Sequence, residues 1–177
     1  METSVRRLPA AAGEDAGLAA EIADLINVVY KAAEKGLWGD GFKRTTAPEI
    51  ASLIAAGQIA VATRDGEIAG AIHIEDIEDD TTIFGMLAAA SAHRSEGIGR
   101  ALVDYAEQDS AQRGRRTMQL ELLVPVGWNH PSKEFLKGWY GRRGYEVVRT
   151  GSMDDLYPHL AVLLACPCDL LIYEKPL

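Results

Sequence analysis

Residues 81–125 constrain the fold more than any other part of this chain. They have the pattern of a strand ("TTIFGMLAAA"), a glycine-rich turn ("HRSEGIGR"), a helix and a second strand ("TMQLELLVP"). Two strands that are joined through a helix run parallel to each other in one sheet. The turns at 65–66 and 78–80 are instead short enough to join antiparallel strands. The sequence therefore predicts a mixed α/β protein whose partly antiparallel sheet has a parallel pair near its middle.

The remaining segments alternate between helical and strand-like patterns. Apolar residues recur at helical spacing in "DAGLAAEIADLINVVYKAAEKG", and Gly36 ends this pattern. The expected elements are helices at 15–36, 47–57, 99–114 and 132–144, and strands at 58–64, 67–77, 81–90, 117–125, 145–150 and 168–176. A length of 177 residues without an apparent linker or repeat indicates a single domain, 1–177.

Composition argues against several functions. The net charge of −8 disfavours general nucleic-acid binding, which depends on positive charge against phosphates. No apolar run approaches the length of a membrane span, so we expect no membrane partner. Residues 1–20 lack the apolar core of a signal peptide, which predicts a cytoplasmic protein. Cys166 and Cys168 cannot complete a tetrahedral zinc site by themselves, and we expect no metal.

The glycine-rich turn has the ingredients of an anion site. The first turn of a helix presents free N–H groups and the positive end of the helix dipole. Gly97 and Gly99 would let an anion approach the backbone without meeting a Cβ atom, while Arg94 and Arg100 add positive charge. The Gly-Lys-Ser/Thr of a mononucleotide-binding loop does not follow. Taken alone, this stretch fits a pyrophosphate cradle and an ordinary strand-to-helix turn about equally well.

Two motifs together resemble the GCN5-related N-acetyltransferase (GNAT) superfamily. Arg94-x-x-Gly97-x-Gly99, between "FGMLAAA" and an Ala-Leu helix, is similar to the acetyl-CoA signature of that family. "WYGRRGY", residues 139–145, is similar to its aromatic-Tyr-x-x-x-Gly-aromatic element. The order of helices and strands also matches, from about residue 15 onward. One departure is Ser95, where many members have glycine; serine fits there if its φ is negative.

The resemblance implies a GNAT-like fold with acetyl-CoA as cosubstrate. The mostly antiparallel central sheet would be flanked by helices and would have a V-shaped splay between two middle strands. The strand before the turn would carry a bulge, pair with pantetheine and direct the thioester at the gap between "FGMLAA" and "QLELLVP". The implied cofactor-binding residues are Leu87, Ala88, Ala89, Arg94, Ser95, Glu96, Gly97, Ile98, Gly99 and Arg100.

Amine acetylation needs a neutral amine, a stabilised oxyanion and a proton for the leaving thiolate. By the same resemblance Tyr140 is the proton donor; the alternative is a core aromatic residue on a helix face. Strand alternation places Glu121 on one face with Gln119 and Leu123. Glu121 is the best candidate for the base, and the alternative is a surface carboxylate. His73 could instead line the site from a neighbouring strand, although such a histidine is more often merely packed.

The loop "EKGLWGDGFKR" is the main candidate for substrate binding. Trp38 and Phe42 could form an apolar wall, and Glu34 and Asp40 could hold an amine; alternatively, the aromatic side chains simply pin the loop to the core. The segment 152–167 could serve as a lid or as a dimer element.

The leading interpretation is an acetyl-CoA-dependent N-acetyltransferase in which the primary amine of a small molecule attacks the thioester directly. A protein acetyltransferase, for lysine or an N-terminal amine, is one alternative, and a non-catalytic acyl-CoA-binding module is another. The acceptor amine, the acyl-chain preference and a homodimer are left open by the sequence.

Overall fold

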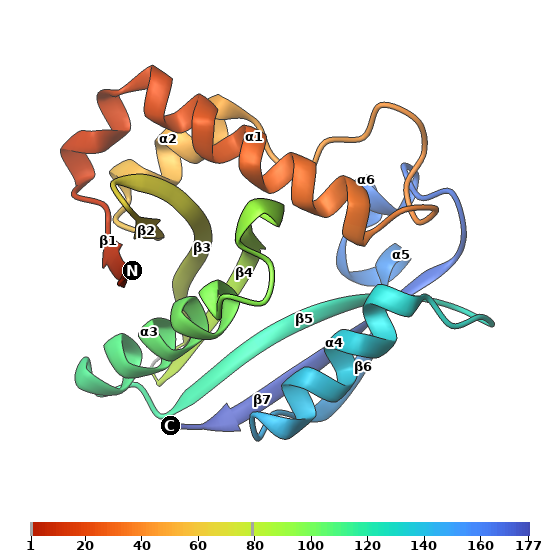
Figure 1. Cartoon of the computed structure of the whole chain (residues 1–177). Coiled ribbons are helices and arrows are strands. Elements are labelled where there is room, and N and C mark those ends of the chain that lie inside the picture. The colour runs from red at the N-terminus through yellow and green to blue at the C-terminus, as the bar shows by residue number, and fades with distance from the viewer. Residues whose placement is uncertain (1, 79) are drawn as a thin grey trace.

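The computed structural model describes residues 2–78 and 80–177, in which seven strands form one sheet (Figure 1). The tip of the turn predicted at 78–80 lies outside the described residues. The order across the sheet is β1 (Thr3–Arg7), β2 (Ile59–Arg64), β3 (Glu67–Glu78), β4 (Thr81–Ala89), β5 (Thr117–Pro125), β7 (Cys168–Pro176) and β6 (Glu146–Ser152). Within the described residues, β4 and β5 are the one parallel pair.

The two middle strands separate soon after they meet. Three residue pairs join β4 to β5 in the described structure, and the last of them is Ile83 with Gln119. Beyond this point the strands diverge, as Figure 1 shows for the ends of β4 and β5. The V-shaped splay is therefore confirmed.

A bulge in β4 accompanies the divergence. His73 of β3 pairs with Gly85, whereas Ala71 pairs with Ala88, so the β4 side has one residue more than the β3 side. Met86 has a φ of 48° and is the residue at which the strand changes phase. Phe84 packs on one face of the sheet, but Met86 and Ala88 pack on the opposite face. The bulge thus exchanges the two faces of β4 at the opening of the splay.

Helices cover both faces of the sheet. One face carries α3 (Ile98–Gln112) and α4 (Pro131–Arg142), which share a single apolar cluster with the strands. The other face carries two separate clusters. One lies between β2–β4 and the helices α1 (Ala16–Ala33) and α2 (Ala47–Ala55); the other joins β5 and β7 to the short helices α5 (Met153–Leu156) and α6 (Pro158–Ala161). The core on this face is therefore divided where β4 and β5 diverge.

The sequence patterns missed the smaller elements. Strand β1 contains arginines and pairs with β2 at one side of the sheet; Arg7 is fixed by Asp109 Oδ2 at 2.6 Å and by Gly57 O at 2.6 Å. Such contacts join residues far apart in the chain and leave no local periodicity. The 3₁₀ turns at Ala10–Glu14 and Ser91–His93, like α5 and α6, are too short to show a helical repeat.

None of the helices in the described ranges combines the length and the apolar character that crossing a membrane requires.

Gly70 of β3 provides a test of how closely α3 packs on the sheet. A Cβ atom at Gly70 would lie 2.7 Å from Ala88 O and 2.7 Å from Ile98 Cγ2. We expect Gly70→Ala to lower the free energy of unfolding by about 1–3 kcal/mol, the usual cost of overpacking. Urea unfolding measures it.

The matched control is Gly141→Ala in α4, where no described atom lies within 4 Å of a new Cβ. It should leave stability unchanged or raise it by up to about 1 kcal/mol, because alanine favours helix more than glycine does. Equal unfolding midpoints for Gly70→Ala and the wild type would refute the close packing of α3 on β3.

Candidate active site

The turn between β4 and α3 has an unusual backbone. Gly97 is the N-cap of α3 and has a φ of 81°, in the left-handed region that glycine tolerates best. Ser95 has a φ of 68°, so the condition under which serine was expected to fit this position, a negative φ, is not met. A left-handed conformation costs a residue other than glycine roughly 1–2 kcal/mol. The hydrogen-bond contact of Glu96 with His93 Nδ1 at 2.8 Å and the ion pair of Glu96 with Arg64 Nη1 at 2.7 Å help to hold it.

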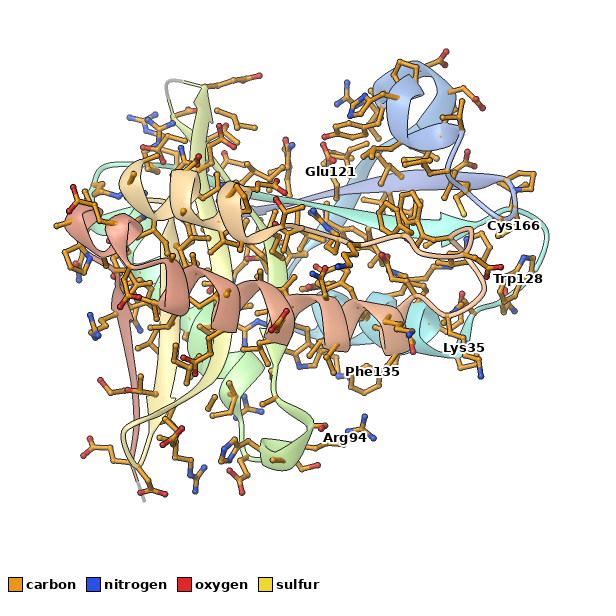
Figure 2. All side chains as sticks on the ribbon, turned by 90° about the horizontal axis from the view of Figure 1, so that it is seen from above. Lys35, Arg94, Glu121, Trp128, Phe135 and Cys166 are labelled. Atoms are coloured by element: carbon orange, nitrogen blue, oxygen red, sulfur yellow. The ribbon has the colours of Figure 1, made fainter. Side chains whose placement is uncertain are left out.

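The same turn fits an anion. Apart from the glycine itself, its chain neighbours and the backbone of α3, no described atom lies within 4 Å of the position that a Cβ would take at Gly97 or Gly99, so both positions face open space. No side chain of the described residues caps the first N–H groups of α3. Arg94 and Arg100 are exposed, and Figure 2 shows the Arg94 side chain projecting from the turn. Ile98 is 1% exposed and packs in the core, so only its backbone can take part.

A groove between α3 and α4 lies next to the turn. It has a volume of about 420 Å³ and is lined by Arg100, Asp104, Glu107, Trp139, Arg142, Arg143 and Lys175. Arg143 Nη2 lies 2.6 Å from Asp104 Oδ1, and Lys175 Nζ lies 2.9 Å from Glu107 Oε2. Arg100 belongs to both the turn and the groove, so the positive surface of the turn extends between the two helices. Sequence reasoning did not find this groove, because α4 and β7 supply its other side.

Tyr140 lies beneath the splay on the α3–α4 face. It is 5% exposed, and its ring packs against Phe84 of β4 at 6.1 Å and Tyr173 of β7 at 6.1 Å between centroids. Phe84 directly follows the last residue that pairs with β5. Burial raises the pKa of Tyr140 well above its ordinary value of about 10. Its hydroxyl therefore stays protonated and can act as a donor.

Tyr30 approaches from the opposite face. It is half-buried on α1, and burial raises its pKa to about 12, while Arg44 and the backbone of Leu87 lower it. Tyr30 also raises the pKa of Tyr140. Residues on opposite faces of a sheet can influence each other in this way where the strands between them have separated. The helical pattern had marked Tyr30 only as an apolar position, since its approach to β4 arises from the fold.

Glu121 lies on β5, two residues beyond the last pair with β4. It is half-buried, and Figure 2 shows it on the side of β5 that faces α5 and α6. The Tyr157 hydroxyl donates a hydrogen bond to Glu121 Oε2 at 2.8 Å. Burial, reinforced by the bond to Glu121, raises the pKa of Tyr157 to about 12, so Tyr157 remains a donor. The predicted alternation is confirmed, because Leu120 and Leu122 pack on the α3–α4 face while Leu123 packs beneath α5 and α6.

His73 lies on β3, on the α1–α2 face. Its Nε2 atom is 2.9 Å from Gln58 Oε1 and 3.9 Å from Glu75 Oε2. Burial lowers the pKa of His73 below its ordinary value, which favours the neutral ring. The contact with Gln58 supports the alternative that His73 is a packed residue. Glu121 therefore stays the better candidate for the base.

The loop between α1 and α2 uses its residues differently from the sequence expectation. Glu34 is 6% exposed; its Oε1 accepts a hydrogen bond from Trp38 Nε1 at 3.0 Å, and its Oε2 lies 2.6 Å from Lys133 Nζ. Both carboxylate oxygens are therefore engaged inside the protein, which argues against Glu34 as the residue that holds an amine. The Glu34–Lys133 contact instead fixes the loop to α4. A local sequence pattern cannot predict this interaction, because the two residues are far apart in the chain.

A cavity of about 310 Å³ opens beside this loop and α1. Trp38 and Phe42 stack with their ring centroids 3.8 Å apart and line it, and exposed Asp40 also contributes to its wall. Trp38 packs against the cluster beneath α5 and α6 as well. Both aromatic side chains therefore line the cavity, and Trp38 also pins the loop to the core; their contact with a substrate stays a prediction.

Among the described residues, no group of three or more His, Cys, Asp or Glu side chains is placed to hold a metal ion.

The fold is similar to that of several solved acetyltransferases. Aminoglycoside 6′-N-acetyltransferase complexed with coenzyme A matches with a TM-score of 0.73 and 15% identity, over 98% of this chain and 96% of that one. The ribosomal-protein-S18-alanine N-acetyltransferase from Escherichia coli matches with a TM-score of 0.66 and 17% identity, over 99% and 94%. YncA from Salmonella typhimurium with its cofactor acetyl-CoA matches at 0.68 and 14%, over 99% and 94%. At these identities the likeness shows the fold alone.

Comparison with curated protein sequences finds no significant match. Residues 55–147, however, match the family model of the acetyltransferase (GNAT) domain. This range covers more than half of the 177 residues and includes the bulged strand, the glycine turn, Glu121 and Tyr140. The chain therefore belongs to the GNAT acetyltransferase family.

Proposed function

We propose that this acetyltransferase transfers the acetyl group of acetyl-CoA to the primary amine of a small molecule, which attacks the thioester directly. The observation that carries the proposal is the splay between β4 and β5. Tyr140 approaches it from one face, and Tyr30 and Glu121 lie on the other. The bulged strand that borders the splay is followed, after a 3₁₀ turn, by the glycine turn at the start of α3, where the first N–H groups have no side-chain cap among the described residues.

Acetyl-CoA fits this arrangement in two places. The open backbone of Gly97 to Gly99 would bind the pyrophosphate, with Arg94 and Arg100 adding charge-assisted contacts. The edge of β4 that faces β5 has no strand partner among the described residues after Ile83, so Leu87 to Ala89 are free to pair with pantetheine. When bound, acetyl-CoA supplies an activated acetyl group.

Glu121 would then act on the attacking amine, and Tyr140 on the departing sulfur. The amine must be neutral to attack, and Glu121, held by Tyr157, would accept its proton. Tyr140 would donate a hydrogen bond to the departing sulfur. Since the ordinary pKa of a thiol is about 8.5, a phenol with a raised pKa stabilises the thiolate mainly through this bond rather than by early proton loss.

A closed acceptor side favours a small molecule over a protein substrate. The α1–α2 loop and the segment after α6 are joined by backbone hydrogen bonds from Gly39 N to Leu163 O at 2.8 Å and from Ala165 N to Leu37 O at 2.9 Å. Trp38 also forms an antiparallel bridge with Leu164. These contacts form a strap over the ends of β5 and β7, where a protein acetyltransferase would need an open groove.

The test is a turnover screen that follows thiol release from acetyl-CoA with polyamines, amino acids, aminoglycosides, arylamines and peptides as acceptors. We expect turnover on at least one small amine. Turnover confined to peptides would support a protein acetyltransferase instead. Tight CoA binding without turnover on any acceptor would support a binding module.

Cofactor affinity should depend on the turn. Gly99→Leu places a side chain in the open space without clash, and Arg94→Ala removes a charge. We expect each variant to weaken CoA binding roughly ten- to a hundredfold, since one charge-assisted contact is worth about 1.5–3 kcal/mol. Calorimetry measures the affinity.

The control for Arg94 is Arg6→Ala, because Arg6 is exposed on β1 at the far side of the sheet. It should bind CoA as the wild type does. If both turn variants retain full affinity, the cradle assignment is wrong.

Glu121→Gln should act on rate more than on binding. A carboxylate can accept the proton of the amine, whereas the amide that replaces it cannot. We expect the variant to turn over more slowly and with an altered pH–rate profile, while CoA affinity stays unchanged. Glu146→Gln, at an exposed position of β6, is the control. An unaltered profile would transfer the role to His73, to water or to a substrate that binds already neutral.

Tyr140→Phe removes one oxygen and keeps the packing. We expect turnover to fall about 10²- to 10⁴-fold, the usual contribution of a positioned acid, while CoA affinity and melting temperature change little. The control is Tyr145→Phe: the Tyr145 hydroxyl donates to Glu107 at 2.8 Å, so this variant removes a bond between α3 and the start of β6 and should keep its turnover. Wild-type turnover in Tyr140→Phe would make Tyr140 structural.

A further inference from the structure

The cavity beside the α1–α2 loop is positively charged. Its charged residues are Lys31, Lys35 and Arg44 against Glu34 and Asp40. Glu34 is already neutralised by Lys133, whose Nζ lies 2.6 Å away. Three cations therefore face one available acid, in a chain whose net charge is −8. A local charge opposite to that of the whole protein indicates that the cavity accepts an anionic group.

Arg44 is the best placed of the three cations. It is half-buried, and within residues 2–78 and 80–177 it takes part in no ion pair. Its guanidinium carbon lies 5.5 Å from the centre of the Tyr30 ring. A partly desolvated guanidinium without a counterion is suited to bind a carboxylate through two parallel hydrogen bonds.

Arg44 also lies within electrostatic reach of the reaction centre. It lowers the pKa values of Tyr30, His73 and Tyr157, which come from α1, β3 and the α5–α6 segment. Tyr157 holds Glu121, and Glu75 acts on both His73 and Tyr157. Arg44 in the cavity wall and Glu121, held by Tyr157, are therefore the cationic and the acidic group that we assign to the acceptor side.

We propose that the acceptor is an amine that carries a carboxylate, as an amino acid does, with its carboxylate bound by Arg44 and its amino group directed to Glu121. This inference rests on the proposed acetyl transfer and names its substrate class. The stacked Trp38 and Phe42 supply an apolar surface in the same cavity for the body of the molecule. Polyamines and aminoglycosides carry several positive charges, so Lys31, Lys35 and Arg44 in the cavity wall would repel them.

Matched pairs that differ only in the carboxylate test this. The affinity of CoA-saturated protein is measured by calorimetry for glycine and glycinamide, L-leucine and L-leucinamide, and L-phenylalanine and L-phenylalaninamide. In at least one pair we expect the acid to bind roughly ten- to a hundredfold more tightly than its amide. Arg44→Gln should abolish this preference, Arg44→Lys should keep part of it, and Arg6→Gln should keep all of it.

The inference is overturned if no acid binds more tightly than its amide, or if Arg44→Gln keeps the preference. Acetyl transfer is measured on the same compounds by thiol release, which separates the two proposals. Transfer to the amides without a preference for the acids would support acetyl transfer and refute the carboxylate site. An Arg44-dependent preference without transfer would support the carboxylate site and refute acetyl transfer to these amines.

Discussion

The divergence of β4 from β5 is the constraint on which the rest of the structure depends. A sheet that stayed paired would separate its two faces with a continuous layer of backbone. Here the pairing stops at Ile83 and Gln119, and the bulge at Met86 exchanges the faces of β4 directly afterwards. One consequence is an unpaired strand edge in the middle of the protein, which would be a liability without a ligand to pair with it. Another is that Tyr140 and Tyr30, on opposite faces, lie near enough for Tyr30 to add to the effect of burial in raising the pKa of Tyr140.

The function of the glycine turn can be inferred only from its position beside this opening between β4 and β5. A helix N-terminus with open backbone would bind many anions, and local sequence could not separate a cradle from a plain turn. What separates them is that the turn follows the free edge of β4, so one extended ligand could lie on both. The left-handed φ of Ser95 indicates that the turn keeps this shape even where the residue is not glycine.

The sequence was sufficient for features that local patterns encode. Helical and alternating spacing placed the larger elements, and alternation placed Glu121 on the face opposite Leu120. It could not supply contacts between distant segments. The partners Glu34 and Lys133 are separated by 99 positions, and Tyr157 meets Glu121 across 36. For this reason the sequence offered Glu34 as a candidate for holding the substrate amine, whereas the fold pairs it with Lys133 of α4. For the same reason the sequence marked Tyr30 only as an apolar position.

The Glu34–Lys133 pair also links the two sides of the site. Removing one partner of a buried ion pair leaves an uncompensated charge, a change that typically costs about 3–5 kcal/mol. Lys133 lies about two helical turns before Tyr140 on α4. Glu34, its partner, also accepts a hydrogen bond from Trp38 in the cavity wall. The helix that carries Tyr140 and the loop that borders the cavity are therefore fixed to each other. Because Lys133 neutralises Glu34, the same contact leaves Arg44 and its neighbouring lysines as the main charges of that cavity, so the pair affects both the position of the loop and the charge of the cavity beside it.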